Sequence, residues 1–303
     1  MDNLIIDGFN LAFRCHFSHA ILSNSKGLQS GCVYGFLISL RSIKNKYPQC
    51  HITVAWDSDS TRRKAVYAEY KATRPKFILG EQISDLMACL KGINIDQAMY
   101  IGEEADDVIA SLTKSLEGII FIYTADKDLL QLVRDGKVLV IRPKTSTGPE
   151  RIYDEEAVKR EFGVAPQDLA CYMSLRGDTV DNVPGIPRIP SSVIVALSNT
   201  YRNPWEIYRH VSEVTLTDFQ RRSITAFEQQ AYLNYQLVSL RDDLKLEVSK
   251  GSPDSVLIEK CLNKYEIRSI NPDTYVNVFV DKPSNIRTGP AITSYSLFEE
   301  ECA

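Results

Sequence analysis

The stretch Leu4-Ile-Ile-Asp7-Gly8 joins three large apolar residues directly to a carboxylate and a glycine. Three further runs are apolar in the same continuous way: Ile52-Thr-Val-Ala55, Ile119-Ile-Phe-Ile-Tyr123 and Val138-Leu-Val-Ile141. Continuous runs of this length are typical of strands that are covered on both faces, whereas half-exposed strands alternate between apolar and polar residues. The runs therefore predict the strands of one buried sheet.

Helical patterns lie between these runs. Apolar residues recur at helical spacing at Val33, Phe36, Leu37, Leu40 and Ile43, and again in two later stretches. Strand and helix patterns that alternate are typical of βαβ units, so we expect an α/β fold with a mainly parallel sheet flanked by helices. From about residue 157 the helical pattern continues without a convincing strand, which predicts a C-terminal helical lobe.

We expect four parts along the chain. Residues 1–156 should form the α/β core, with a basic segment at about 60–80. Residues 157–248 should form the helical lobe, residues 249–282 a C-terminal packing segment, and residues 283–303 a tail.

Composition narrows the class of protein. The 303 residues are 44% hydrophobic, which is enough for a sizeable core, and the formal net charge is −4. The sequence has no apolar run of about 18 residues and no basic-then-apolar leader, so we expect a cytoplasmic protein. The seven cysteines include no C-x-x-C pair, which favours reduced thiols over disulfides or a zinc site. No P-loop, G-x-G-x-x-G or G-x-S-x-G motif occurs.

Acidic residues follow the apolar runs. Asp7 follows Leu4-Ile-Ile6, Asp57 follows Ile52 to Trp56, and Asp126 follows Ile119 to Ala125, with Asp128 two residues later. Glu103-Glu-Ala-Asp-Asp107 follows Ala98-Met-Tyr-Ile101. In an open α/β sheet, ligands bind beyond the carboxyl ends of the strands. One such acid is more often a helix N-cap, but four strand ends with the same feature favour a shared site.

Clustered carboxylates need cations. Two of them 4 Å apart repel by about 4 kcal/mol at an effective dielectric constant near 20, and oxygen ligands select hard ions, here Mg²⁺ or Mn²⁺. Two such ions roughly 4 Å apart support phosphodiester hydrolysis. The i, i+3 spacing of Asp178 and Asp181 places them on one face of a predicted helix, where they complete a second metal site or form an exposed acidic helix end.

Several motifs together resemble the 5′ nuclease family, which comprises flap endonucleases and the 5′ to 3′ exonuclease domain of bacterial DNA polymerase I. They are Ile6-Asp-Gly8, Val33-Tyr-Gly-Phe36, Asp57, Tyr70-Lys71 with Arg74, Glu104-Ala-Asp-Asp107, Thr124-Ala-Asp-Lys-Asp-Leu129, Gly177-Asp-x-x-Asp-Asn182 and Leu240-Arg-x-Asp-Leu-x-Leu-Glu-Val248. The resemblance implies a PIN-like core and a stand-alone phage or bacterial 5′ nuclease with two or more divalent ions. The implied metal ligands are Asp7, Asp57, Glu104, Asp106, Asp107, Asp126, Asp128, Asp178 and Asp181.

The basic segment has an implied role in this family. Between Thr61 and Lys76 the sequence holds six cationic residues and one acid. By the resemblance, this segment is a helical arch in which Tyr70 stacks on a base and Lys71 reaches the scissile phosphate, helped by Arg63 and Arg74. The alternative is a solvated basic helix face. Arg14 and the helix start near Gly31 are further candidates for DNA contact.

The helix-hairpin-helix of the family is rewritten here. Arg188 and Pro190 stand where two glycines are expected, and Ser192 stands where a lysine is expected. Because proline has no N–H, the usual nest of backbone donors cannot form unchanged, and a bound monovalent cation is doubtful. We expect Arg188, Ser191 and Ser192 to hold duplex DNA in a weaker or different way.

The expected partners are DNA with 5′ flaps, nicks or free 5′ ends, and RNA primer strands. Ser294-Tyr-Ser-Leu-Phe298 resembles the short Leu-Phe peptides that dock on a sliding clamp, although a frayed tail explains it as well. Two rival functions are a PIN-like ribonuclease and a DNA-junction binder without catalysis. The basic segment and Asp178 with Asp181 disfavour the first rival, and the intact set of acids disfavours the second.

Overall fold

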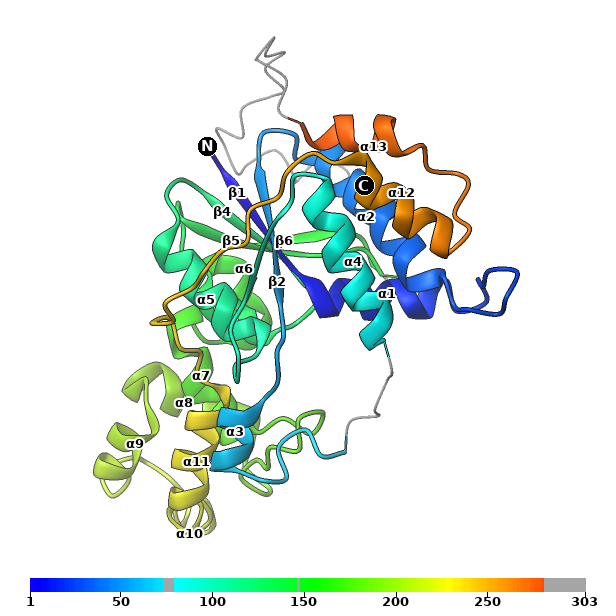
Figure 1. Ribbon diagram of the computed structural model, residues 1–303. Helices are drawn as coiled ribbons and strands as arrows, with labels where there is room; N and C mark the ends of the chain where they lie inside the picture. Colours follow the sequence, from blue (N-terminus) through cyan, green and yellow to red (C-terminus); the bar gives the residue numbers. More distant parts are fainter. Residues whose placement is uncertain (74–78, 146–147, 281–303) are drawn as a thin grey trace.

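The computed structural model describes residues 1–73, 79–145 and 148–280, and a six-stranded sheet forms its centre (Figure 1). The strand order is β3-β2-β1-β4-β5-β6. The strands are β1 (Asn3–Asp7), β2 (His51–Trp56), β3 (Asp96–Met99), β4 (Ile120–Tyr123), β5 (Val138–Arg142) and β6 (Arg151–Tyr153). The first five run parallel and β6 pairs antiparallel with β5. The predicted mainly parallel sheet is confirmed.

Two strands differ from the sequence prediction. Strand β3 begins before the expected run Ala98–Ile101 and ends at Met99. Its first residue, Asp96, is buried because His51, Lys250 and the backbone of Gly251 satisfy its carboxylate. Strand β6 is a three-residue edge strand that is exposed at its first two residues. Neither strand carries the continuous apolar pattern from which the other four were predicted.

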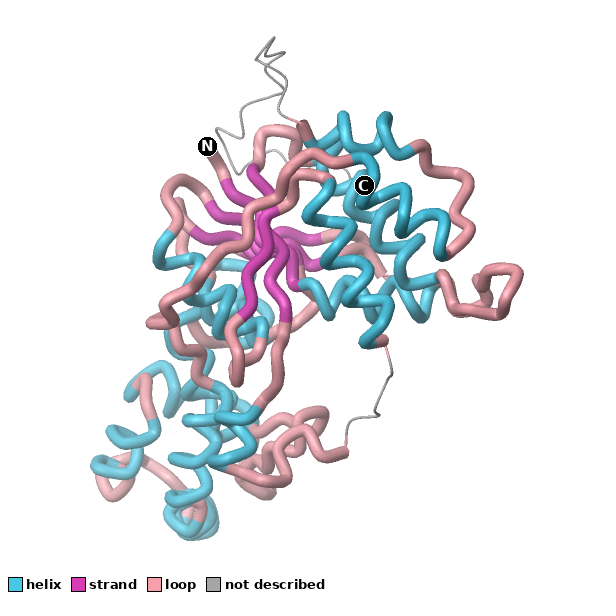
Figure 2. Tube along the Cα trace, in the orientation of Figure 1, coloured by secondary structure: helices cyan, strands magenta, loops and turns pink. Residues whose placement is uncertain are grey.

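Helices cover both faces of the sheet (Figure 2). Within β1, Leu4 and Ile6 face one hydrophobic core and Ile5 faces the other. The first core is formed with α1 (Gly8–Ser18), α2 (Gly31–Lys46), α4 (Gly80–Gly92), α12 (Ser255–Lys264) and α13 (Pro272–Phe279). The second is formed with α5 (Ala105–Ser115), α6 (Glu155–Phe162) and α7 (Leu169–Arg176). Burial on both faces explains why apolar residues follow one another in the four predicted strands instead of alternating with polar ones.

A close contact fixes the junction between β1 and α1. Gly8 packs against the fully buried ring of Trp56, and a Cβ atom at this position would lie 2.5 Å from that ring. The indole stacks on Phe36 at 5.9 Å between ring centroids and donates a hydrogen bond of 3.0 Å to Gln97. Only glycine fits this approach, so Asp7 is held beside the end of β2.

The helical lobe lies beyond the carboxyl ends of the strands. It contains α7, α8 (Ser191–Tyr201), α9 (Pro204–His210), α10 (Asp218–Ala226) and α11 (Glu228–Val238), and α3 (Thr61–Val66) packs beside α11 (Figure 1). The 3₁₀ helix η1 (Asp128–Leu132) lies between β4 and β5 in the chain, and η2 (Pro166–Asp168) lies between α6 and α7. The lobe has its own apolar cluster, which includes Ile186, Ile189 and Ile207.

Residues 239–254, which we call the C-terminal strap, return from the lobe along the core. The Leu244 N–H donates to the Ser111 hydroxyl at 3.1 Å, and Ser249 exchanges two backbone hydrogen bonds with Gln97 of β3. The strap thereby covers the exposed edge of β3 before the chain enters α12. Among the described residues, six cysteines form no disulfide, and no helix is long and apolar enough to cross a membrane.

Candidate metal centre and nucleic-acid site

Asp7, the last residue of β1, is a buried acid of the site. Its carboxylate accepts hydrogen bonds from the backbone of Asn10 at 3.1 Å, which caps α1, and from the Thr124 hydroxyl at 2.9 Å. Because β1 and β4 are neighbours in the sheet, these bonds bring Asp7 toward the loop that carries Asp126. The same Thr124 hydroxyl accepts the backbone N–H of Asp126 at 3.0 Å.

The acids after β2 and β3 meet at the start of α5. Asp57 accepts the N–H of Ala105 at 3.0 Å, and Glu104 is the N-cap residue of that helix. Asp106 lies in its first turn. The helix N-terminus therefore presents its backbone dipole to carboxylates that come from two strand ends.

The charge of this cluster is not balanced by protein cations alone. Burial, followed by the negative charges of Asp57 and Asp126, raises the pKa of Asp7 to about 7. Loss of hydration raises the pKa of Asp57, and loss of hydration with the charge of Asp126 raises the pKa of Asp106 well above the usual range. Each shift means that another negative charge is costly at this place.

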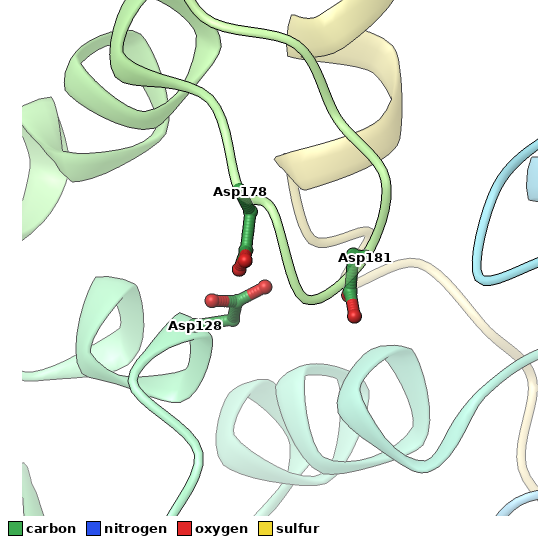
Figure 3. Close-up of side chains that lie close together, drawn as sticks. All are labelled: Asp128, Asp178 and Asp181. Carbon is green, nitrogen blue, oxygen red and sulfur yellow. The ribbon is translucent and has the colours of Figure 1, made fainter. Parts of the chain in front are cut away.

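In a second acidic group, Asp178 and Asp181 of the loop after α7 approach Asp128 of η1 (Figure 3). Carboxylate oxygens of Asp128, Asp178 and Asp181 all lie within 4.8 Å of one another. Asp128 Oδ1 is buried and has no hydrogen-bond partner, and its pKa is raised well above the usual range by loss of hydration and by the charges of Asp126 and Asp181. Buried polar atoms without partners are rare, so this oxygen marks a place for a cation.

The expectation that Asp178 and Asp181 share a helix face is wrong. Gly177, with φ 74°, ends α7, and both aspartates lie in the loop that follows. Two backbone hydrogen bonds between Asp178 and Val183, of 2.8 and 2.7 Å, close this loop. The turn, rather than a helix face, brings the two carboxylates to Asp128.

The donor set fits a divalent ion. All the candidate ligands are carboxylate oxygens, which are hard donors, and several of them have raised pKa values because they are crowded and desolvated. A divalent cation held here would supply compensating charge, and Asp128 Oδ1 would be available to bind it. Asp7, Asp57, Glu104, Asp106, Asp126, Asp128, Asp178 and Asp181 converge on this region from four strand ends and one lobe loop.

Lys71 lies at the edge of the acidic cluster. Its ammonium donates to Glu104 at 2.8 Å and lies 4.0 Å from Asp181. Its neighbour Tyr70 is only 4% exposed, and the phenol contacts Glu104 at 3.2 Å and Asp181 at 3.4 Å. Lys71 is thus held against two of the acids, whereas Tyr70 does not present a ring face for stacking on a base in this structure.

Arg63 and Asp107 form a buried pair instead of facing a substrate. Arg63 is 2% exposed and bonds Asp107, Glu104 and the Leu237 carbonyl. Asp107 is fully buried, and it also accepts from Arg62 at 3.1 Å and from the backbone of Arg241 at 2.9 Å. Their environments therefore differ from those expected for a phosphate contact and a metal ligand, because their polar atoms already have protein partners.

The remaining predicted contacts lie at the periphery. Arg14 donates to the Lys144 carbonyl at 2.9 Å. A Cβ atom on Gly31 would lie 2.1 Å from the His19 carbonyl, so the close approach at Gly31 is to the protein's own backbone. Arg74 lies outside the described residues, as does the segment Ser294–Phe298.

The proline-rich hairpin connects α7 to α8. Arg188 is exposed and adopts φ 60°, the left-handed conformation that glycine adopts most readily. Pro190 is the N-cap residue of α8, which has no side-chain cap, and Ser191 and Ser192 are exposed in the first turn. The backbone thus keeps a glycine-like turn at Arg188 and presents a cation beside a helix N-terminus.

Three residues near the acids did not enter the sequence-based set of site residues. Thr124 and Asn10 bond Asp7 as described, and the Asn10 side chain accepts the N–H of Ala125 at 3.1 Å. Lys127 lies 3.0 Å from Asp178 and connects the sheet loop to the lobe loop. The only sequence signal for Lys127 was its position between Asp126 and Asp128.

Two family profiles match the chain. One, described as "5′-3′ exonuclease, N-terminal resolvase-like domain", matches residues 2–163, and the other, "5′-3′ exonuclease, C-terminal SAM fold", matches residues 164–256. The two matches meet where the sheet ends and the helical lobe begins.

Two curated relatives are similar to most of the chain. A 5′-3′ exonuclease of Aquifex aeolicus is 36% identical over 278 residues, which cover 88% of this chain and 92% of that protein. DNA polymerase I of Bacillus subtilis is 30% identical over 285 residues, which cover 92% of this chain and 32% of that protein. This chain therefore spans nearly the whole length of the first relative and about a third of the second.

Solved structures share the fold. A phage T5 5′-exonuclease with bound divalent metal ions superposes with a TM-score of 0.62 at 17% identity and covers 91% of this chain and 97% of that one. A phage T5 flap endonuclease in a complex with DNA and metal ions gives a TM-score of 0.61 at 18% identity, with the same coverage.

Proposed function

Since the chain belongs to the 5′-3′ exonuclease family, we propose that it is a structure-selective 5′ nuclease that hydrolyses phosphodiester bonds in DNA with 5′ flaps, nicks or free 5′ ends. The observation that supports this most strongly is the convergence of Asp128, Asp178 and Asp181 within 4.8 Å, at the carboxyl end of a sheet whose other strand ends are also acidic. Phosphate is an anion, so a group of carboxylates repels DNA unless it also holds cations. Such a group therefore favours metal-dependent hydrolysis over DNA binding alone.

We propose Mg²⁺, with Mn²⁺ as a substitute, as the ions of the site, in two positions. Asp7, Asp57, Glu104, Asp106 and Asp126 would hold one, and Asp128, Asp178 and Asp181 would hold the other. Bound there, divalent ions supply an activated water and neutralise charge on the leaving oxygen. Asp107 is left out of this set because Arg63, Arg62 and Arg241 already satisfy its oxygens.

The chain's own cations position the phosphate. Lys71, beside Glu104, lies where a scissile phosphate approaches the acids, and its positive charge offsets their repulsion of that phosphate. Arg188 and the first-turn N–H groups of α8 offer a separate phosphate contact on the lobe. Two contacts at different distances from the acids suit recognition of DNA shape rather than of base identity.

The decisive experiment compares cleavage of labelled 5′-flap DNA, nicked duplex and hairpin RNA in Mg²⁺ and in chelator. Asp126→Asn should lose cleavage by about a hundredfold or more, because it removes a charge from the centre of the cluster. Asp242→Asn serves as the matched control, since this acid lies on the surface and pairs with Lys114 at 3.0 Å. Cleavage that persists in chelator or in Asp126→Asn contradicts the metal mechanism.

The same assay separates the rival functions. Hairpin RNA cut in preference to the DNA substrates indicates a PIN-like ribonuclease, and junction binding without any cleavage indicates a binding protein. We also propose that RNA primer strands are cut. We further propose that residues 294–298 bind a sliding clamp, and a pull-down with and without residues 290–303 tests this binding. A DNA substrate favours the cytoplasm of a bacterium or of a phage-infected host as the site of action.

A further inference from the structure

The loop that carries Asp178 and Asp181 is joined directly to the segment that carries Lys71. The Asn182 side-chain amide donates to the Glu69 carbonyl at 2.9 Å, and the Lys71 N–H donates to the Asp181 carbonyl at 3.0 Å. These two bonds run in opposite directions between the segments, as in a short ladder. They connect the lobe to the segment after α3 at two adjacent points.

Both sides of this ladder are held in a conformation that most residues avoid. Asn182 has φ 59° and Lys71 has φ 55°, in the left-handed region. Asparagine tolerates this region better than other residues with a side chain, but for lysine it costs about 1 kcal/mol or more. A strained backbone persists only where its surroundings fix it, and here the surroundings are the Asp181 carbonyl and the Asn182 amide.

The consequence of the ladder is the place of the Lys71 ammonium. With its backbone attached to Asp181, Lys71 reaches Glu104 at 2.8 Å while remaining 4.0 Å from Asp181. It therefore lies between a ligand candidate from the sheet side and one from the lobe. If the ladder opened, the strained turn at Lys71 would relax and the ammonium would move away from this position.

We propose that Asn182 is a positioning residue for the nuclease reaction: its amide attaches the lobe loop to residues 69–71 and so sets Lys71 against the acids. Asn182 does not contact the scissile phosphate and is not itself a catalytic residue. The inference rests on the proposed function, in which Lys71 meets that phosphate. It also gives a route by which DNA bound to the lobe affects the catalytic centre, because the same loop carries two of the proposed metal ligands.

Asn182→Gly is the appropriate variant, because glycine keeps the left-handed φ and removes only the amide, without adding charge near the acids. The chain offers a matched control in Asn94, which has φ 63° and donates its side-chain amide to the Phe279 carbonyl at 3.2 Å. Asn94→Gly makes the same chemical change far from the acids.

Steady-state cleavage of 5′-flap DNA in Mg²⁺ tests the proposal. We expect Asn182→Gly to lower kcat by about three- to tenfold, as loss of a hydrogen bond that orients a charged group implies, with KM within twofold. Asn94→Gly should leave both constants unchanged. In a Lys71→Ala background the Asn182→Gly change should cost nothing further, because it acts through Lys71. An equal loss in both backgrounds, or a loss confined to KM, overturns the proposal.

Amide hydrogen exchange gives a readout independent of activity. Peptides that contain residues 69–72 should exchange faster in Asn182→Gly than in the wild type and Asn94→Gly, because the loop that carries the acceptor of the Lys71 N–H, the Asp181 carbonyl, is no longer attached to Glu69. Unchanged exchange contradicts the ladder. If the wild type cleaves no DNA, the proposed function fails, and the exchange result alone decides whether Asn182 positions this segment.

Discussion

Asp7 shows most clearly how a single residue can be at once well supported and electrostatically strained. Its oxygens have two good donors, from Asn10 and Thr124, yet its pKa is raised to about 7 by burial and by neighbouring carboxylates. Hydrogen bonding lowers the pKa and desolvation raises it, and here desolvation dominates. The two hydrogen bonds therefore hold the carboxylate in a fixed orientation, and its negative charge is costly unless a cation lies nearby.

This balance predicts how stability depends on pH. Between about pH 4 and pH 7 the folded protein holds a proton on Asp7 that the unfolded chain has lost, so the free energy of unfolding falls as pH rises through this interval. In chelator, Tm should fall by several degrees from pH 5 to pH 8, and Mg²⁺ should recover most of the loss at pH 8. Asp7→Asn should flatten the dependence. Differential scanning calorimetry gives the comparison, and a Tm that rises with pH in chelator would contradict the assigned burial.

Single acids were predictable because each follows an apolar run, which locates it at a strand end. Their partners were not. The bonds of Asn10 and Thr124 to Asp7 depend on how β1 and β4 pair, and the occupation of Asp107 by two arginines depends on where α3 lies. Sequence pattern predicts which residues stand at a strand end, but contacts between segments decide which oxygens remain available.

At the scale of elements, α3 is attached to the core through one buried guanidinium. Arg63 on α3 bonds acids at the start of α5 and the carbonyl of Leu237 at the end of α11. Three elements therefore meet at a side chain that is 2% exposed. The basic segment that begins with α3 is thus supported by the pair Arg63 and Asp107.

Removal of this guanidinium should destabilise the fold. Arg63→Ala leaves Asp107 and Glu104 buried with fewer partners, so we expect a loss of about 3–5 kcal/mol in the free energy of unfolding. Arg62 is the matched neighbour, because it bonds Glu103 and Asp107 but is 29% exposed, and Arg62→Ala should cost about 1 kcal/mol. Urea denaturation measures both. Equal costs would show that the buried pair has no special role.

The hairpin between α7 and α8 leads to a different prediction, on affinity. Pro190→Gly with Ser192→Lys restores a backbone donor and a cation at the start of α8, so duplex DNA should bind more tightly, by about tenfold at low salt. Binding should also become steeper in salt by about one further counterion. Fluorescence anisotropy against salt concentration measures this. Unchanged duplex affinity in the double variant would show that the proline-rich hairpin already holds the duplex fully.

Element prediction succeeded where the hydrophobic pattern was strong. The four apolar runs became β1, β2, β4 and β5. The apolar pattern did not predict β6 or the start of β3. Strand β6 is an exposed edge strand, and β3 begins with Asp96, whose buried carboxylate is hydrogen-bonded, so neither strand is a continuous apolar run. The loop position of Asp178 and Asp181 was missed because i, i+3 spacing does not distinguish a helix from a tight turn.

For the whole molecule, the C-terminal strap connects the lobe to the far end of the sheet. Gly251 in the strap passes so close to the chain that a Cβ atom would lie 2.3 Å from the Ile95 nitrogen. The atoms that this Cβ would meet belong to the backbone of Asn94 and Ile95, so they cannot move aside as the end of a side chain could. The strap therefore depends on this glycine for its contact with β3.

Gly251→Ala should detach the strap from β3. We expect a loss of about 1–3 kcal/mol in the free energy of unfolding, the usual range for overpacking. Gly80→Ala is the control, because a Cβ atom there would meet nothing within 4 Å and alanine favours the helix that begins at this residue. Chemical denaturation of both variants tests this, and a neutral Gly251→Ala would mean that the strap moves without cost.

The general plan, an α/β core followed by a helical lobe, could be read from the sequence. The path of residues 239–254 could not, because the alternation of Leu244, Leu246 and Val248 with charged residues indicates an extended segment but not the surface on which it packs. The same holds for the way the lobe approaches the sheet, which depends on pairs such as Lys127 with Asp178 that lie far apart in the chain.

The loop between α7 and α8 has a consequence for the order of synthesis. The sheet acids up to Asp128 are translated first, while Asp178 and Asp181 follow only after α6 and α7. A nascent chain that ends at Asp128 therefore holds six of the eight candidate ligands and none of the lobe that carries the other two. The acidic group of Asp128, Asp178 and Asp181 can therefore form only after translation has passed the lobe loop.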